Sequence, residues 1–300
     1  MTPSIDETVE LDSLALIKQL NRSPSAHKGD AGKVVIVGGA PGMAGALLLA
    51  GNAAMHLGAG WTILEMLDPS SAFVVVEHPE LMVRLAEHNA AEQLRDIKPD
   101  LLAIGPGLGD SPAAYEWLKA SLAYPLSPLI IDADALNLIS ENDNLLVALQ
   151  KRNQDFPNQS VITPHPGEAA RLLKISSAGV QERRLAALKD LVKLTGSIVV
   201  LKGQHTLIAS PQHASVQCNQ GNPGMATGGM GDVLTGSIAA IAAQGIRHQL
   251  DLWSSTCIAV QLHASAADNL VSKGVGPIGL TPSETILEMR SMLNGHQSAI

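Results

Sequence analysis

The sequence predicts an α/β protein, a three-layer α/β/α sandwich with a mainly parallel sheet between two layers of helices. Short apolar runs rich in β-branched residues, such as 34–37 and 197–201, alternate along the chain with alanine- and leucine-rich segments of helical length. Unbroken apolar runs are typical of strands buried on both faces, and their alternation with helices favours a parallel sheet. The composition agrees, because 46% of the 300 residues are hydrophobic and only 16% are charged, which suffices for a large core.

The predicted elements follow one another in a regular order, and turns with glycine or proline separate many of them. The predicted strands are 34–37, 62–66, 101–104, 129–132, 160–163 and 197–201. The predicted helices are 46–57, 113–122, 133–139, one that begins at Glu168, and two long apolar ones at 233–244 and 252–271. We expect one domain over 27–292, preceded by a partly helical N-terminal extension, 1–26, and followed by a C-terminal tail, 293–300.

The charge and the cysteine content indicate which partners and which cellular compartment to expect. The formal net charge is −8 without a basic block, which argues against a nucleic-acid or anionic-membrane partner. The two cysteines, Cys218 and Cys257, cannot build a disulfide framework and do not lie at zinc-binding spacing, so we expect a cytoplasmic protein. The segment 34–64 carries no charge, but its glycine cluster at 38–45 favours a strand, a loop and a helix over a membrane span.

The segment 221–236 is the most informative for function. It is rich in glycine, contains the single acid Asp232, and leads into an uncharged, alanine-rich run. Glycines let backbone N–H groups approach a ligand closely, and a helix beginning at Asp232 would add free N–H groups and a positive dipole end. Such a pocket suits phosphate, and the carboxylate could take a proton from a hydroxyl that meets the phosphate. The alternative is a glycine-rich turn with Asp232 as a simple N-cap.

Other polar or glycine-rich loops follow the predicted strands directly. They are 38–45, 105–109, 132–137, 163–168 and 202–206. Ligands of parallel α/β sheets bind at the carboxyl ends of the strands, so we expect these loops to build one site. The loops 38–45 and 105–109 lack the spacing of dinucleotide-binding and P-loop motifs, and the chain has no GxSxG elbow of a serine hydrolase.

The side chains in these loops each have two interpretations. His165 and Glu168 could contact a substrate and, through water, a magnesium ion, or they could be a turn residue and an acid at a helix start. Lys202 could meet a phosphate, or it could be a solvated lysine at a strand exit. Asp132 and Asp134 could touch metal or substrate, or they could cap a helix.

Taken in order, these segments resemble the ADP-dependent NAD(P)H-hydrate dehydratases, which have the ribokinase-like fold. The resemblance covers about 27–290 and is carried by His27-Lys28-Gly29 with Gly32 and 34–39, by 105–109, by 132–137, by 163–168, by Lys202-Gly203 with Thr206, and by 228–232. It implies a repair enzyme that removes water from the S epimer of hydrated NADH or NADPH, with ADP or ATP as phosphate donor and Mg²⁺ as cofactor.

The resemblance also implies roles for individual residues. Ala46, Gly107 and His165 would line the hydrated nicotinamide site, and Asp232 would face the substrate as the catalytic base. Lys202, Gly203, Gln204, His205, Thr206 and Gly231 would hold the adenosine nucleotide. Gly228, Gly229 and Gly231 would form the anion hole, and Glu168 would meet magnesium through water.

Partners and rival functions follow from the same comparison. Residues 1–26 are too short for the epimerase to which some family members are fused, so we expect a separate epimerase, and the resemblance implies a homotetramer. The nearest rival is a small-alcohol kinase of the same fold, which would release a stable phosphate ester. The second rival is a nucleotide-binding regulator without turnover.

Overall fold

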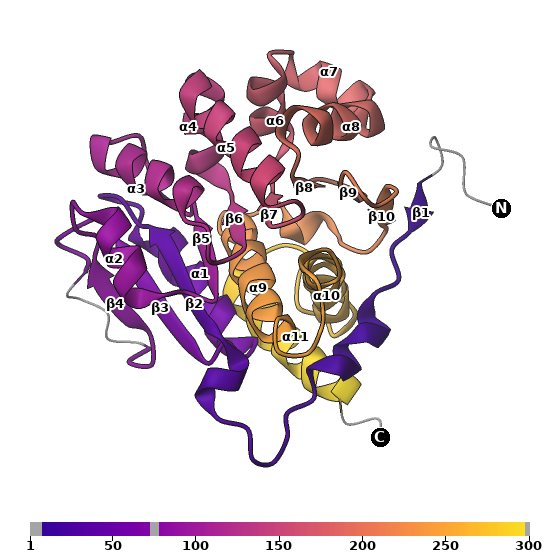
Figure 1. The fold of residues 1–300 in the computed structure, drawn as a ribbon. Helices are drawn as coiled ribbons and strands as arrows, with labels where there is room; N and C mark the ends of the chain where they lie inside the picture. Colours follow the sequence, from indigo (N-terminus) through magenta and orange to yellow (C-terminus); the bar gives the residue numbers. More distant parts are fainter. Residues whose placement is uncertain (1–7, 73–77, 298–300) are drawn as a thin grey trace.

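The computed structural model describes residues 8–72 and 78–297, which form one sheet covered by helices on both faces (Figure 1). The described strands lie in the order β1-β10-β9-β8-β7-β6-β5-β2-β3-β4. From β4 to β8 in this order all neighbours are parallel, whereas β9 is antiparallel to both β8 and β10. The predicted three-layer sandwich with a mainly parallel sheet is therefore confirmed.

The elements have the following bounds. The strands are β1 (Val9–Glu10), β2 (Lys33–Gly38), β3 (Trp61–Met66), β4 (Met82–Leu85), β5 (Leu101–Ile104), β6 (Leu129–Ile131), β7 (Ser160–Ile162), β8 (Ile198–Leu201), β9 (Thr206–Ala209) and β10 (Val216–Cys218). The α-helices are α1 (Ala44–His56), α2 (Ala90–Ile97), α3 (Pro112–Ala123), α4 (Ala133–Glu141), α5 (Asp143–Asp155), α6 (Pro166–Leu173), α7 (Ser177–Glu182), α8 (Arg184–Thr195), α9 (Met230–Gly245), α10 (Leu252–Ser272) and α11 (Pro282–Gln297). Three 3₁₀ helices are η1 (Leu14–Leu20), η2 (Lys28–Ala31) and η3 (Pro223–Met225).

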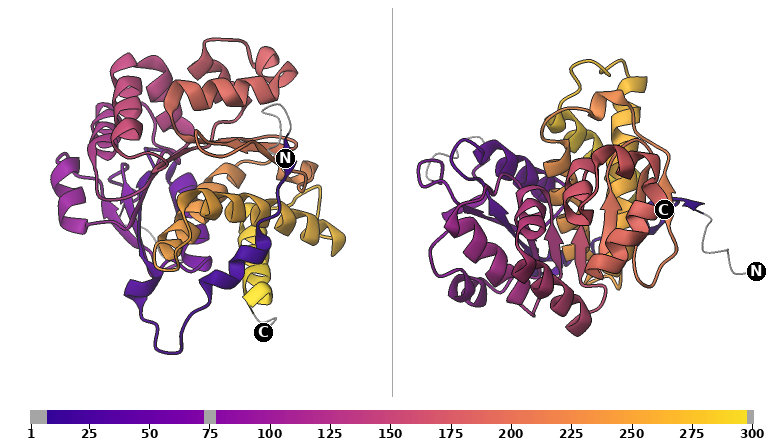
Figure 2. Two further views of the ribbon diagram at one scale, coloured as in Figure 1. Left: turned by 45° about the vertical axis from the view of Figure 1, so that its right-hand side comes forward. Right: turned by 90° about the horizontal axis from the view of Figure 1, so that it is seen from above.

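Alternate residues of the central strands supply two separate cores. Val34 and Ile36 of β2 pack with residues of α1, α9, α10 and α11, whereas Val35 and Val37 pack with residues of α2 to α6 and α8 on the other face. All four side chains are fully buried, as expected for a strand covered on both sides. Figure 2 shows the sheet between these two layers of helices.

Helix α9 lies directly against the sheet and is covered by its neighbours. Every residue from Val233 to Gly245 is buried. A Cβ atom placed on Gly236 would lie 2.0 Å from the carbonyl oxygen of Ala50 in α1. The backbones of α1 and α9 therefore touch at this point, and only glycine fits there.

The described parts of both chain ends pack on the domain, and the predicted tail needs a correction. Where it is described, the N-terminal extension packs on the domain, because Leu11 and Ile17 are buried and the N–H of Ser13 donates to Oε1 of Gln261 at 2.7 Å. The tail predicted from residue 293 is wrong for 293–297, because α11 continues to Gln297. Leu293 lies one helical turn after the buried Met289 and is itself buried. Residues 1–7 and 298–300 of the two predicted segments lie outside the described residues.

Several edge strands were not predicted from the sequence. The pair β9 and β10 and the outer strands β1 and β4 are only two to four residues long, too short for a clear alternating pattern. In the described part of the chain no helix is long and apolar enough to traverse a bilayer. The uncharged segment 34–64 forms β2, α1 and the start of β3.

Candidate active site

The backbone brings the residues that follow the parallel strands into one row. The N–H of Asp132, directly after β6, donates to the carbonyl of Ile104 at the end of β5, at 3.1 Å. Likewise the N–H of Lys202, directly after β8, donates to the carbonyl of Pro164 at 2.9 Å. These bonds extend the ladder past the strand ends, so both side chains start from the same edge of the sheet.

A buried ion pair lies at the centre of this edge. The Nζ atom of Lys202 is 2.7 Å from Oδ1 of Asp132 and 3.9 Å from Oε2 of Glu168. The hydroxyl of Thr235 in α9 donates to Oδ2 of Asp132 at 2.8 Å. Burial alone lowers the pKa of Lys202, but Asp132 and Glu168 outweigh burial, so the pKa is raised and the ammonium stays charged. Lys202 is thus not a solvated lysine.

Neither of two aspartates acts as a simple helix cap. Asp132 occupies the N-cap position of α4, but its side chain makes no cap hydrogen bond and instead pairs with Lys202. The N-cap of α9 is Gly229, and α9 begins at Met230, two residues before the predicted start, so Asp232 lies inside the first turn. The N-cap interpretation of Asp232 is therefore wrong.

The carboxyl group of Asp232 is strongly perturbed. Burial raises its pKa from the ordinary 3.8 to about 7, and the negative charge of Asp132 acts in the same direction. The positive charge of Lys202 lowers the pKa again, but only in part. A carboxyl that titrates near neutral pH can accept and return a proton under physiological conditions.

His165 and Glu168 are joined in a capping box at the start of α6. Nδ1 of His165 accepts the N–H of Gly167 at 2.9 Å, and Oε2 of Glu168 accepts the N–H of His165 at 2.7 Å. Burial and the charges of Lys202 and Arg171 lower the pKa of His165, so the imidazole is neutral with its proton on Nε2, 3.3 Å from Oε1 of Glu168. Burial raises the pKa of Glu168 to about 7. Both residues thus have a structural role, and both still border the ion pair.

The two loops expected to meet the nicotinamide lie side by side. A Cβ atom on Gly107 would lie 3.2 Å from Cβ of Ala46, and Gly107 has a φ of +57°. The N–H of Ala40 donates to the carbonyl of Gly107 at 2.7 Å, which fixes the two loops to each other. Oδ2 of Asp134 accepts the N–H of Gly109 at 2.9 Å, so this carboxylate holds the same loop in place.

The residues expected to hold the nucleotide lie near the ion pair of Lys202 and Asp132. Residues 202–205 form the turn between β8 and β9, and the hydroxyl of Thr206 donates to the carbonyl of Gly203 at 3.0 Å. Gln204 and His205 are exposed on this turn. A Cβ atom on Gly231 would lie 3.3 Å from Nζ of Lys202, so the glycine loop borders the ion pair.

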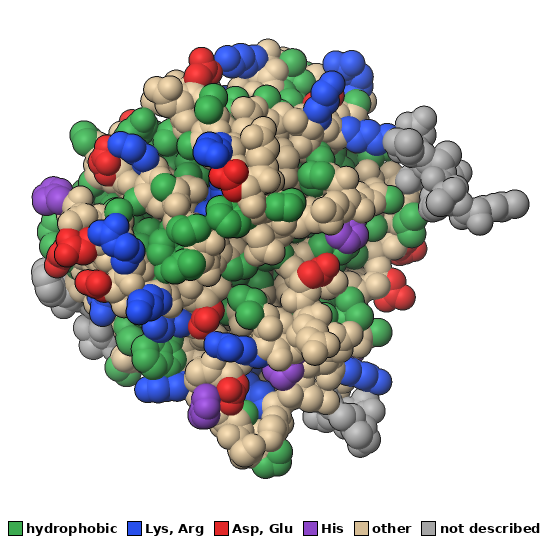
Figure 3. Space-filling model, viewed as in Figure 1, with side chains coloured by type: hydrophobic (Ala, Val, Ile, Leu, Met, Phe, Trp, Pro, Cys, Tyr) green, Lys and Arg blue, Asp and Glu red, His purple; other side chains and the backbone are tan. Residues whose placement is uncertain are grey.

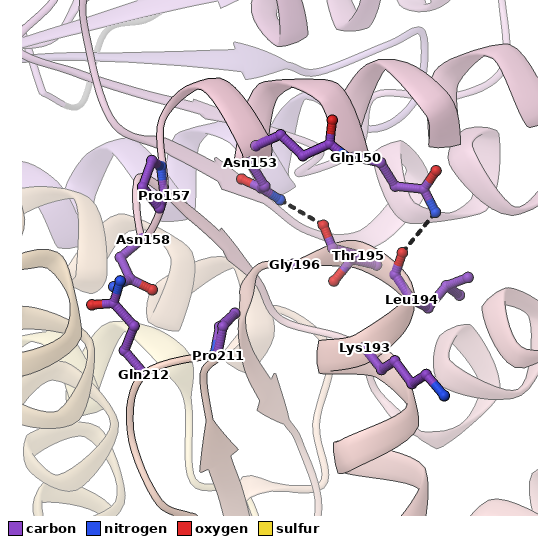
Figure 4. A pocket seen from close by; sticks show the side chains of 11 residues that line it. Gln150, Asn153, Pro157, Asn158, Lys193, Leu194, Thr195, Gly196, Pro211 and Gln212 are labelled. Atoms are coloured by element: carbon purple, nitrogen blue, oxygen red, sulfur yellow. Dashed lines mark hydrogen bonds between the residues drawn. The ribbon is translucent and has the colours of Figure 1, made fainter.

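Some sequence features lie elsewhere. His27 and Lys28 precede β2 and belong to the opposite edge of the sheet, where Nζ of Lys28 lies 4.6 Å from the ring centre of Trp61. A hollow of about 450 Å³ also lies at that edge, near the starts of β7 and β8 (Figure 4). Its lining includes Gln150, Asn153, Lys193, Thr195, Pro211 and Gln212. This hollow is separate from the loops at the carboxyl ends.

Sequence reasoning missed three side chains that organise the site. Thr235 lies one helical turn after Asp232, and this spacing could have indicated a shared face of α9. Asn137 accepts two hydrogen bonds from Arg171, at 2.7 and 3.0 Å, and links α4 to α6. No local pattern marks Arg184, which contacts the turn after β8 only through the fold.

The carboxylates around Lys202 do not form a cage of direct ligands for a magnesium ion. Within the described ranges no group of three or more His, Cys, Asp or Glu side chains has the geometry of a metal site. Both oxygens of Asp132 and Oε2 of Glu168 already accept hydrogen bonds. Magnesium usually keeps several waters and is bound mainly through substrate phosphates. The donor set around Lys202 fits that mode.

Charges of both signs are scattered over the face of the molecule in Figure 3. Lys, Arg, Asp and Glu side chains alternate there without a continuous basic patch. The expected absence of a nucleic-acid partner stays a prediction.

Comparison with known proteins identifies relatives over nearly the whole chain. The family model described as NAD(P)H-hydrate dehydratase matches residues 34–287. A bifunctional NAD(P)H-hydrate repair enzyme from Leishmania braziliensis is 39% identical over 292 residues, which are 91% of this chain and 51% of that protein. The chain thus spans about half the length of such bifunctional relatives.

A second relative and a solved structure match over most of both chains. An ADP-dependent (S)-NAD(P)H-hydrate dehydratase from Neisseria meningitidis is 37% identical over 279 residues, 91% of this chain and 88% of that protein. The ADP/ATP-dependent NAD(P)H-hydrate dehydratase from Bacillus subtilis, co-crystallised with ATP and Mg²⁺, superposes with a TM-score of 0.80 at 25% identity and covers 97% of this chain and 99% of its own. These matches confirm the ribokinase-like fold. The chain belongs to the NAD(P)H-hydrate dehydratase family.

Proposed function

We propose that the protein dehydrates the S epimer of hydrated NADH or NADPH and consumes ADP or ATP as the phosphate donor. One observation carries this proposal. The carboxyl of Asp232, with a pKa near 7, lies in the first turn of α9 beside the buried ammonium of Lys202. A proton acceptor, a positive charge and a helix N-terminus thus meet at one point, which is what phosphoryl transfer to an alcohol requires.

In the proposed reaction Asp232 takes the proton of the C6 hydroxyl while that oxygen attacks the terminal phosphorus of the nucleotide. The bond from this phosphorus to the bridging oxygen breaks, and AMP or ADP leaves. In the second step the ring nitrogen lone pair expels phosphate by breaking the C6–O bond. Loss of a proton from C5 then restores the C5–C6 double bond. Phosphorylation is useful because hydroxide is a poor leaving group at neutral pH.

The binding residues follow from their places around Asp232. We assign the hydrated nicotinamide to Ala46, Gly107 and His165, because the loops of Ala46 and Gly107 lie side by side and His165 follows β7 at the same edge of the sheet. We assign the nucleotide to the turn 202–206 with Gly231, because both border the ammonium of Lys202.

The anion hole and the metal contact complete the proposed site. Backbone N–H groups of Gly228, Gly229 and Gly231 would stabilise the transferring phosphoryl group. Glu168 would hold Mg²⁺ through water, and the ion would neutralise charge on the phosphate oxygens. The ATP and Mg²⁺ of the Bacillus subtilis co-crystals support this assignment.

Recovery of the absorbance band of reduced nicotinamide tests the activity. Purified protein receives hydrated NADH, magnesium and either ADP or ATP. We expect the band to return with inorganic phosphate as co-product, to be lost in Asp232→Asn, and to persist in Asp143→Asn, whose carboxylate is exposed. A stable phosphate ester in place of the band would establish the kinase alternative. Nucleotide binding without any turnover would establish the regulator.

Oxygen labelling tests the phosphorylated intermediate. With ¹⁸O in the C6 hydroxyl, the proposed route places the label in inorganic phosphate. Label found only in water would exclude phosphorylation of the substrate while leaving the dehydratase activity intact.

We further propose the cellular setting of the reaction. A specific dehydratase for one epimer needs an epimerase to supply it from the other, and we assign that step to an NAD(P)H-hydrate epimerase. We also propose a homotetramer in the cytoplasm. The low share of charged residues, 16% of the chain, is compatible with a sizeable subunit interface. Light scattering of the purified protein would measure the mass of the assembly.

A further inference from the structure

Arg184, the first residue of α8, lies on the turn proposed to hold the nucleotide. Its Nη2 atom donates to the carbonyl of Leu201 at 3.1 Å and to that of His205 at 3.5 Å, and Nη1 lies 3.4 Å from the carbonyl of Lys202. A Cβ atom on Gly203 would lie 2.9 Å from Nη1. The guanidinium group therefore fills the inner side of the turn and contacts its backbone directly.

This turn has an uneven distribution of hydrogen-bond partners. Its carbonyl groups are engaged, because Arg184 binds those of Leu201, Lys202 and His205 and the hydroxyl of Thr206 binds that of Gly203. In contrast, within the described chain the N–H groups of Gly203, Gln204 and His205 have no intramolecular acceptor. These N–H groups are therefore available as donors to an anionic or nucleotide ligand.

The turn also needs support from outside its own backbone. His205 has a φ of +54°, a left-handed conformation that is unfavourable for a side chain with a Cβ atom, and Gly203 has a φ of +135°. Such conformations persist when the surroundings enforce them. Hydrogen bonds from Arg184 on both sides of the turn supply that constraint.

The charge of Arg184 is free to act on a ligand. Oε1 of the neighbouring Gln181 accepts a hydrogen bond from Nη1 at 3.2 Å and orients the guanidinium group. Among the residues that the structure describes, no Asp or Glu forms an ion pair with Arg184. Its positive charge therefore adds to the positive potential at the turn.

We propose that Arg184 is a positioning residue for the adenine nucleotide: it holds the turn 202–205 so that the N–H groups of this turn face the ligand. The inference rests on the proposed function, because it assumes that the turn binds nucleotide. Lysine cannot replace Arg184, because a single ammonium group does not reach carbonyl groups on both sides of a turn as a planar guanidinium group does.

Nucleotide affinity of Arg184 variants tests the inference. Arg184→Ala and Arg184→Lys are compared with Arg183→Ala, which removes the same charge from the adjacent exposed position. Calorimetric titration with ADP alone gives Kd, and steady-state rates give kcat and the two KM values. We expect Kd and KM for the nucleotide to rise about tenfold or more in both Arg184 variants. We expect Arg183→Ala, the KM for hydrated NADH and kcat at saturating nucleotide to change less than about twofold.

Two further measurements distinguish a positioning role of Arg184 from a general loss of folding. Added guanidinium ion is expected to restore part of the ADP affinity of Arg184→Ala and none in wild type. Unchanged ADP affinity in both variants would overturn the inference. A parallel rise of both KM values together with a lower unfolding temperature would overturn it as well. If wild type binds ADP but does not dehydrate hydrated NADH, the proposed function fails, and the ADP affinities still decide the role of Arg184. If wild type binds no adenine nucleotide, both proposals fail.

Discussion

The ammonium of Lys202 lies 2.7 Å from Oδ1 of Asp132, although the two residues are 70 positions apart in the chain. They meet because β6, β7 and β8 are parallel neighbours, so that the residues after β6 and β8 emerge at one edge. Neither residue alone shows from the sequence that it is buried. Their pairing explains why the ammonium of Lys202 can remain charged although it is largely enclosed.

Removal of one partner of this pair should destabilise the fold. In Asp132→Asn the ammonium of Lys202 loses its nearest carboxylate, and Glu168 at 3.9 Å compensates only in part. We expect a loss of roughly 2–4 kcal/mol in the free energy of unfolding, measured by urea denaturation. Asp155→Asn, at the exposed pair with Lys151, should cost less than about 1 kcal/mol. Equal losses at the two pairs would contradict the assigned burial.

The pKa of Asp232 predicts how activity depends on pH. A general base must be ionised, so kcat/KM should fall below about pH 7, where Asp232 becomes protonated. In Glu168→Gln the neighbouring negative charge that raises this pKa is absent, so the inflection should move to lower pH. An inflection that stays in place would show that another group controls the rate. The measurement is a pH profile of the initial rate at low substrate concentration.

The same shift predicts a pH-dependent gain in stability for Asp232→Asn. The folded pKa of about 7 lies above the ordinary value of 3.8, so the folded state binds this proton more tightly than the unfolded chain does. This contribution is fully present below the ordinary pKa and is lost as the pH rises to about 7. The variant should therefore exceed wild type in unfolding free energy at about pH 8, and the difference should shrink towards about pH 5. A difference that grows on acidification would reverse the assigned sign.

Two adjacent glycines should respond differently to alanine. Gly229 has a φ of +95°, and a Cβ atom there would lie 2.5 Å from Cδ1 of Leu49, whereas a Cβ atom on Gly228 meets nothing within 4 Å. We expect Gly229→Ala to lose at least about 1–2 kcal/mol of stability. Gly228→Ala should stay within about 0.5 kcal/mol of wild type but should weaken nucleotide binding, because its methyl group would enter the proposed phosphate space. Thermal unfolding and ADP titration of both variants decide this.

The buried strands and the loops at their carboxyl ends were predictable from the sequence. The apolar run 101–104 coincides with β5, and the predicted loops converge at one edge, because parallel pairing follows from alternation with helices. The start of α9 was placed two residues late, because Gly229, and not the acid, occupies the cap. Sequence spacing also could not show that Asp132 binds Lys202 or that Arg184 reaches the turn after β8. Such contacts depend on strand order and on the distance between elements far apart in the chain.

The proposed base is attached to a helix that is buried from Val233 to Gly245, whereas the turn that would receive the nucleotide is largely exposed. Amide protons in the middle of α9 should therefore exchange with deuterium only on global opening, while those of Gly203, Gln204 and His205 should exchange almost as fast as in a free peptide. The proton acceptor would then keep a fixed position through each catalytic cycle. The nucleotide would instead arrive at and leave an exposed turn, which Arg184 holds in one conformation.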